Sequence, residues 1–205
     1  WFLPVAARAD AVSDWNVIAN TVIITNAARP APASIIDITY VNAAIYDAVN
    51  AIDGRYSVFA VTPTTSSAGA SPEAATAAAA YTVLSAFFPG QQAYLDGVYA
   101  AYLLGIPDGP PKATGIAVGT EVAVAFLVSR SGDGRNASVP YVFGSGPGVY
   151  QVTPGAPPPP VTPLVPWVAQ MRPFALESPS QFRAAGPPDL GSAQWAEDFN
   201  EVKAF

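Results

Sequence analysis

Apolar residues recur with helical spacing in the segment between Ser34 and Gly54. Steps of three and four residues place them on one side of an α-helix, and they are Ile38, Val41, Ile45, Ala48, Val49 and Ile52. Ser34 and Asp37 form an S-x-x-D pattern that predicts the helix start, and Gly54 predicts its end. Asp47 falls opposite the apolar side of the helical wheel, so we expect it to face solvent.

Four more stretches of the first 130 residues carry helix signals. A helix capped by Ser13 is expected to end by Arg29-Pro30, because proline and the residue before it resist helical geometry. Ser71-Pro72-Glu73 predicts the start of an Ala-rich helix that runs to Phe88. Two further helices are expected over residues 92–104 and 112–130. The last of these is apolar on almost every side and is therefore predicted to be the central, buried helix, with Gly115, Gly119 and Ala123 allowing close packing.

Proline and glycine dominate the segment 131–190, which excludes a long helix there. Aromatic residues recur through it, unlike in disordered chains, so we expect an ordered wrap anchored on the helices. Ser192 predicts the cap of a last helix over residues 194–205, with Trp195, Phe199 and Val202 on one side. The expected fold is all-α: a bundle of five or six helices over residues 10–130, the wrap over 131–190, and the start of a further helix over 191–205.

Composition removes several classes of function. The 205 residues include no His and no Cys, which excludes disulfides, Cys-ligated metals and the common Ser-His and Cys-His catalytic pairs. Nine Lys and Arg against 15 Asp and Glu give a net charge of −6, the wrong sign for binding nucleic acid. The best candidate for a membrane span is the uncharged run from Ala74 to Leu95, but Pro89-Gly90-Gln91-Gln92 interrupts it, so no span is expected.

The first nine residues resemble the end of a secretory signal. Residues 1–9 are mostly apolar and close with the small-x-small pattern Ala7-Arg8-Ala9, which predicts cleavage before Asp10. The alternative is an apolar arm packed on the folded body. We therefore expect an exported protein, periplasmic or extracellular in a bacterium.

No motif in the chain predicts a catalytic, cofactor-binding or metal-binding residue. The segment Gly144-Ser145-Gly146-Pro147-Gly148 lacks the following helix of a phosphate loop, and Ser131 to Asn136 lacks the late Glu of a calcium loop. Asn136-Ala137-Ser138 is a formal glycosylation sequon, meaningful only in a eukaryotic secretory pathway. For the carboxylates of the second helix and of the last one, solvated or capping roles are expected; these are Asp37, Asp47, Asp53, Glu197, Asp198 and Glu201.

A family resemblance spans nearly the whole chain. It rests on residues 10–16 (DAVSDWN), 44–56 (AIYDAVNAIDGRY), 71–75 (SPEAA), 88–91 (FPGQ), 106–110 (IPDGP), 144–150 (GSGPGVY), 172–174 (RPF), 178–183 (SPSQFR) and 198–204 (DFNEVKA). Together these resemble the N-terminal half of bacterial vanadium-dependent haloperoxidase-like proteins, of the type 2 phosphatidic acid phosphatase superfamily.

The resemblance implies a catalytic site that this sequence does not carry. In the family, Lys-x6-Arg-Pro, Pro-Ser-Gly-His and later Ser-Arg and His segments hold vanadate or a substrate phosphate. Here Arg29-Pro30 and Arg172-Pro173 have Val22 and Val165 where the Lys should stand, and Pro179-Ser180 is followed by Gln181. The chain is therefore expected to be a non-catalytic front half whose partner is the missing C-terminal half, with no cofactor of its own and vanadate possible in the parent.

Two other interpretations stay open. In the first, the chain is a self-contained, secreted helical binding or scaffold domain. In the second, its carboxylates alone carry out catalysis. A homodimer is a possible assembly of the chain. Catalysis by carboxylates alone would show as phosphatase or halide-oxidation activity of these 205 residues. The fragment interpretation predicts an exposed apolar patch on the final helix.

Overall fold

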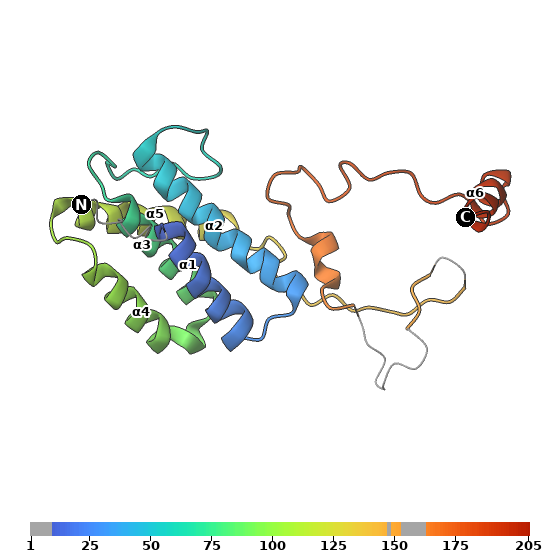
Figure 1. Cartoon of the computed structure of the whole chain (residues 1–205), viewed down its shortest axis with the longest axis horizontal. Helices are drawn as coiled ribbons and strands as arrows, with labels where there is room; N and C mark the ends of the chain where they lie inside the picture. The colour runs from blue at the N-terminus through green and yellow to red at the C-terminus, as the bar shows by residue number, and fades with distance from the viewer. Residues whose placement is uncertain (1–9, 147–148, 153–162) are drawn as a thin grey trace, which may run out of the picture. The chain divides into compact units, whose positions relative to one another are not determined.

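The computed structural model describes residues 10–146, 149–152 and 163–205 of the chain (Figure 1). Every regular element in these ranges is a helix, which confirms the all-α fold. The α-helices are α1 Ala11–Asn20, α2 Ala31–Asp53, α3 Pro72–Phe87, α4 Gln92–Leu104, α5 Pro110–Ser129 and α6 Ala193–Lys203. A π-helix, η1 Thr21–Asn26, continues α1, and two short 3-10 helices are η2 Pro89–Gln91 and η3 Pro166–Gln170.

Contacts divide the chain into two compact units. One comprises residues 1–132 and 141–165, and the other comprises 133–140 and 166–205. Helices α1 to α5 therefore belong to the first unit, whereas η3 and α6 belong to the second.

Helix α3 forms the centre of the first unit. It contacts α1, α2, α4 and α5, and residues 74–80 along it are all buried, as are Val83 and Leu84. Six of the seven residues from 74 to 80 are Ala, so neighbouring helices can approach α3 from several sides. The central position predicted for residues 112–130 is wrong, because Val124 and Val128 on α5 remain 48% and 69% exposed.

Helices α3 and α5 approach each other backbone to backbone. A β-carbon placed on Gly115 would collide with the carbonyl oxygen of Ser71, and one on Gly119 with that of Ala75. The predicted role of these glycines in close packing is therefore confirmed. Among the described residues α5 is the one helix long and apolar enough to cross a membrane, and 33% of that window is buried. Core helices of soluble proteins pass the same test, so this is weak evidence for a membrane span.

Helix α1 begins one turn earlier than predicted. The carboxylate of Asp10 caps it by accepting the N–H of Ser13 at 2.8 Å, so Ser13 is not the cap. Buried Trp15 packs edge-on against Tyr99 and Tyr102 of α4, with ring centroids 6.1 and 5.7 Å away. The aromatic contacts join α1 to α4 although more than 80 residues separate them in the sequence.

Helix α2 ends as predicted and starts earlier. Gly54 adopts a left-handed φ of 64° at the C-terminal cap, a conformation that costs glycine little. At the other end α2 begins at Ala31, directly after Pro30. Ser34 is buried within the first turns, and its hydroxyl donates to the carbonyl of Ala31 at 2.9 Å. The predicted Ser34–Asp37 capping pattern is therefore wrong.

The second unit combines loops with two short helices. Trp167 and Met171 are buried in or beside η3, and the N–H of Arg172 donates to the carbonyl of Asp133 at 2.8 Å. Ser192 caps α6 as predicted by accepting the N–H of Trp195. Residues 141–165 of the Pro/Gly-rich segment belong to the first unit, and there the rings of Tyr141, Phe143 and Tyr150 contact one another. Residues 147–148 and 153–162 lie outside the described ranges.

Candidate functional site

Asp47 organises the segment that follows α2. Its carboxylate accepts backbone N–H groups from Phe59, Ala60 and Val61 at 2.7, 2.8 and 2.8 Å. The residue is 2% exposed, so the expectation that Asp47 faces solvent is wrong. A buried carboxylate is stable when hydrogen-bond donors surround it, and here the returning chain supplies three.

Two other side chains of α2 hold the same segment. The amide of Asn50 donates to the carbonyl of Tyr56 at 2.8 Å and accepts the N–H of Tyr56 at 2.9 Å. The hydroxyl of Tyr46 donates to the carbonyl of Ser57 at 2.8 Å. Residues 56–61 are therefore fixed to α2 at both ends and in the middle, although they form no helix.

This fixed segment presents large apolar side chains to solvent. Tyr46, Tyr56, Val58 and Phe59 are 39%, 70%, 48% and 41% exposed, and we call them the aromatic loop surface. They are neighbours because Tyr46 bonds to Ser57, which lies between Tyr56 and Val58. The ring of Phe59 also lies 6.3 Å from that of Phe126, which anchors the surface to the core.

No motif or helix signal in the sequence marks residues 56–70, so this surface was not predicted. One signal was present, since three large apolar residues stand among small and polar ones directly after the helix. Exposed side chains on a backbone held by a rigid scaffold are typical of binding sites.

A second carboxylate holds the next part of the connection. Glu121 on α5 accepts the N–H and the hydroxyl of Thr64 at 2.6 and 2.7 Å, and the N–H of Thr65 at 3.0 Å. Hydrogen bonding from the side chain of Thr65, followed by that from Thr64, lowers the pKa of Glu121 from 4.5 to about 2. Glu121 therefore tethers the connection to α5 as Asp47 tethers it to α2.

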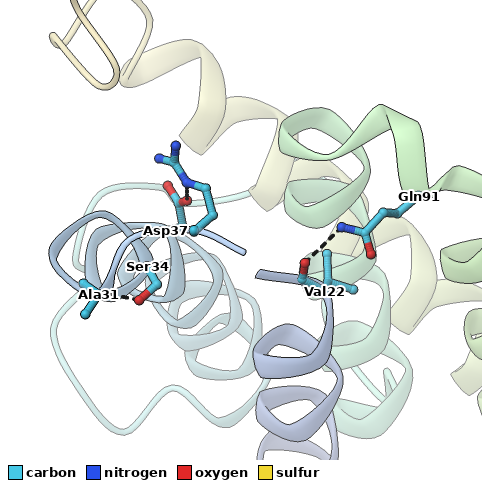
Figure 2. Close-up of polar contacts among 6 residues, drawn as sticks. Val22, Ala31, Ser34, Asp37 and Gln91 are labelled. Atoms are coloured by element: carbon cyan, nitrogen blue, oxygen red, sulfur yellow. Dashed lines mark hydrogen bonds and ion pairs between the residues drawn. The ribbon is translucent and has the colours of Figure 1, made fainter. Parts of the chain in front are cut away.

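Asp37 forms a buried ion pair at the start of α2. The Nε of Arg29 lies 2.7 Å from Oδ2 of Asp37, whose side chain is fully buried. Figure 2 labels Asp37 and marks this contact with a dashed line. Arg29 follows Ala28, which adopts a positive φ of 47° beyond the π-helix. The solvated or capping role expected for Asp37 is wrong, because the residue is an internal ion-pair partner.

The guanidinium of Arg130 lies 5.5 Å above the ring of buried Tyr40.

The side chain of Gln91, in η2, binds the π-helix η1. The Nε2 of Gln91 donates to the carbonyl of Val22 at 2.8 Å, as drawn in Figure 2. The amide of Asn26 donates to the Oε1 of the same side chain at 2.9 Å. One glutamine thereby connects η2 to both ends of η1, which supports a helix type that is rare in proteins.

An exposed polar cluster joins α3 to α4. The hydroxyl of Tyr81 and the amide of Gln92 both donate to Oδ1 of Asp96 at 2.7 Å. The bond from Tyr81 lowers the pKa of Asp96, and the same bond raises the pKa of Tyr81. Tyr81 also stacks on Tyr99 at 4.3 Å, so the cluster is explained by helix packing.

The carboxylates considered from sequence do not converge on one site. Asp37 and Asp47 bind different partners, and Asp53 lies exposed at the end of α2. No group of three or more His, Cys, Asp or Glu in the described part of the chain is placed to hold a metal.

Local hydrogen bonds form in both glycine-containing loops that the sequence singled out. The oxygen Oδ1 of Asp133 accepts the N–H of Arg135 at 3.0 Å. The side-chain amide of Gln151 donates to the carbonyl of Gly144 at 3.2 Å. Pro147 and Gly148 of the glycine-rich segment lie outside the described residues.

Helix α6 carries the predicted apolar patch. Trp195, Phe199 and Val202 are 38%, 56% and 75% exposed, and their spacing of four and three residues places them on one side of the helix. We call these three residues the α6 ridge. Glu197, Asp198 and Glu201 are exposed as expected, and Asp198 accepts a hydrogen bond from Gln194 at 2.6 Å.

Comparisons with known proteins identify no relative. No family model, curated protein or solved structure matches the chain.

Proposed function

We propose that this chain is the non-catalytic helical part of an exported bacterial enzyme resembling vanadium-dependent haloperoxidases and acid phosphatases. The parent would oxidise halides with peroxide or hydrolyse phosphate esters, with its catalytic groups in another segment. The sequence resemblance is the origin of this proposal, and the α6 ridge is the structural observation that supports it.

The α6 ridge has the form of a docking helix. An amphipathic helix that presents apolar residues at i, i+4 and i+7 typically binds a hydrophobic groove of a partner. Trp195, Phe199 and Val202 have this spacing, while α6 contains no buried residue among those described. Trp is also among the residues that most often dominate interface energies. The proposed occupant of this ridge is the catalytic half of the same parent protein.

Three cations of the first unit are held by partners within it and not in an oxyanion pocket of the kind that the resemblance implies. Arg29 is paired with Asp37, and Arg130 lies over Tyr40. The Nζ of Lys112 lies 2.6 Å from the carbonyl of Leu103 and 2.8 Å from Asp108, at the end of α4. Because these three cations are already engaged, we place the oxyanion in the other half of the parent.

A binding experiment tests the proposal. The parent gene is read past the codon for Phe205, and the following segment is produced separately and titrated with this chain by calorimetry. Replacing Trp195 and Phe199 together by Ser is expected to weaken binding at least tenfold, since each removes a large apolar contact. Glu197→Gln, on the opposite side of α6, is the matched control and should bind as the original chain does.

Two results would contradict the proposal. One is a gene that stops after Phe205 without Lys-x6-Arg-Pro and Pro-Ser-Gly-His segments downstream. The other is a double variant of the α6 ridge that binds the following segment as tightly as the original.

The second candidate function is a self-contained, secreted binding or scaffold domain. The aromatic loop surface favours it, because Asp47, Asn50 and Tyr46 hold the backbone that carries these exposed side chains in one arrangement. Such a domain should unfold cooperatively by itself and gain no stability from the downstream segment, whereas the fragment should be stabilised by it. Thermal unfolding with and without that segment separates the two functions.

A further inference from the structure

The aromatic loop surface has a pair of opposite charges at its edge. Asp53 and Arg55 flank Gly54, where α2 ends, and both are exposed. Neither has an ion-pair partner among the residues that the structure describes. Arg55 is also the one charged residue between Gly54 and Ala70. The surface therefore consists of three aromatic rings and a valine beside one positive and one negative group.

This arrangement is complementary to itself. In a two-fold symmetric dimer, both copies use the same surface patch. If residue i of the first copy contacts residue j of the second, then residue j of the first copy also contacts residue i of the second. Asp53 of each copy can then face Arg55 of its partner, while Tyr46, Tyr56, Val58 and Phe59 pack across the axis. Two chains of net charge −6 would thus meet where each Asp53 faces an Arg55 of opposite charge.

The loop is also prepared for binding before a partner arrives. The N–H groups of Phe59, Ala60 and Val61 are bound by Asp47, and both backbone groups of Tyr56 are bound by Asn50. Binding through side chains on a fixed backbone avoids most of the entropy cost of ordering a loop. Because these backbone groups are already hydrogen-bonded within the chain, a partner would be contacted by the apolar side chains and by the charges of Asp53 and Arg55.

We propose that the aromatic loop surface, with Asp53 and Arg55, is the centre of an interface between two copies of this chain. The proposal is independent of the α6 ridge and of the proposed catalytic partner. Tyrosine-rich patches of this kind commonly form the centre of an interface, where water is excluded.

Sedimentation of the full chain over increasing concentration tests the proposal. We expect a monomer–dimer equilibrium that Tyr56→Ser combined with Val58→Ser weakens about tenfold or more. Trp195→Ser combined with Phe199→Ser should leave it unchanged, which separates this surface from the α6 ridge. Circular dichroism of each variant checks that the helices are intact.

Charge exchange gives the sharper test. The proposed dimer has two symmetry-related contacts between positions 53 and 55. Asp53→Arg places two arginines at each contact, and Arg55→Asp places two aspartates there. Each variant should therefore be mostly monomeric. An equimolar mixture of the two variants should form a heterodimer, because each arginine then faces an aspartate.

Three results would overturn the proposal. They are a chain that stays monomeric at high concentration, a dimer unaffected by the Tyr56 and Val58 changes, or a mixture of the charge variants that associates no better than either alone. A dimer lost only with the α6 ridge would assign self-association to that helix instead.

Discussion

Gly119 on α5 lies against the backbone of Ala75 on α3, so close that a β-carbon at position 119 would overlap the Ala75 carbonyl. Gly115 stands one turn earlier against Ser71 in the same way. The two helices can therefore pack at this distance only with glycine at both positions. Dense packing of this kind leaves no room for relaxation around an added group.

Gly119→Ala is expected to destabilise the chain by about 2 kcal/mol, because the added methyl group forces α3 and α5 apart. The free energy of unfolding in urea measures the effect. Gly97→Ala is the matched control, since Gly97 also lies in a helix but has nothing within 4 Å of the added carbon. It should stabilise the chain by about 0.5 to 1 kcal/mol. Equal effects of the two substitutions would contradict the close approach.

Asp47→Ala is expected to cost about 3 kcal/mol of unfolding free energy, because it leaves three N–H groups of residues 59–61 without their acceptor. The connection should then become sensitive to limited proteolysis near Tyr56. Glu197→Ala, which removes an exposed carboxylate of α6, should change stability by less than about 0.5 kcal/mol. Resistance of the Asp47→Ala connection to protease would show that other contacts hold the loop.

Glu121 predicts a dependence of stability on pH. Its pKa is about 2 in the folded chain, against 4.5 in its ordinary state. Its contribution to stability is therefore complete above about pH 4.5 and is lost as the pH falls towards 2. Glu121→Gln should be less stable than the original at pH 6, and the difference should shrink on acidification. A difference in unfolding free energy that stays constant from pH 6 to about pH 2 would contradict this prediction.

Arg29→Met is expected to destabilise the chain by about 3 kcal/mol, because it leaves the buried carboxylate of Asp37 without the guanidinium that faces it. The double change Arg29→Met with Asp37→Leu should recover part of this loss, since an apolar pair of similar size avoids burying a charge. Urea unfolding of the three proteins gives the comparison. If Arg29→Met alone is as stable as the original, the ion pair contributes nothing to folding.

Local signals determined most of the helices. Ser71 before Pro72 fixed the start of α3, and Gly54 and Gly105 stand where α2 and α4 end. These are short-range effects of capping and backbone freedom, so they can be recognised in the sequence alone. The sequence also determined the apolar ridge of α6, because its spacing depends on the helical repeat and not on any partner.

Tertiary contacts decided the roles of individual residues. An S-x-x-D pattern at Ser34 and Asp37 is indistinguishable in sequence from a helix cap, but Arg29 pairs with Asp37 and places it inside. Asp47 lies on the polar side of its helix and is nevertheless buried, because residues 59–61 return to bind it.

The central helix and the aromatic loop surface were likewise settled by packing between distant segments. Helix α5 is apolar on most sides, yet Ala-rich α3 occupies the centre because small side chains admit neighbours all round. Helical periodicity describes one element at a time, whereas burial depends on which segments meet. The sequence by itself therefore determined where helices form, and the tertiary structure decided which of their polar residues face inward and which aromatic rings of the connection face solvent.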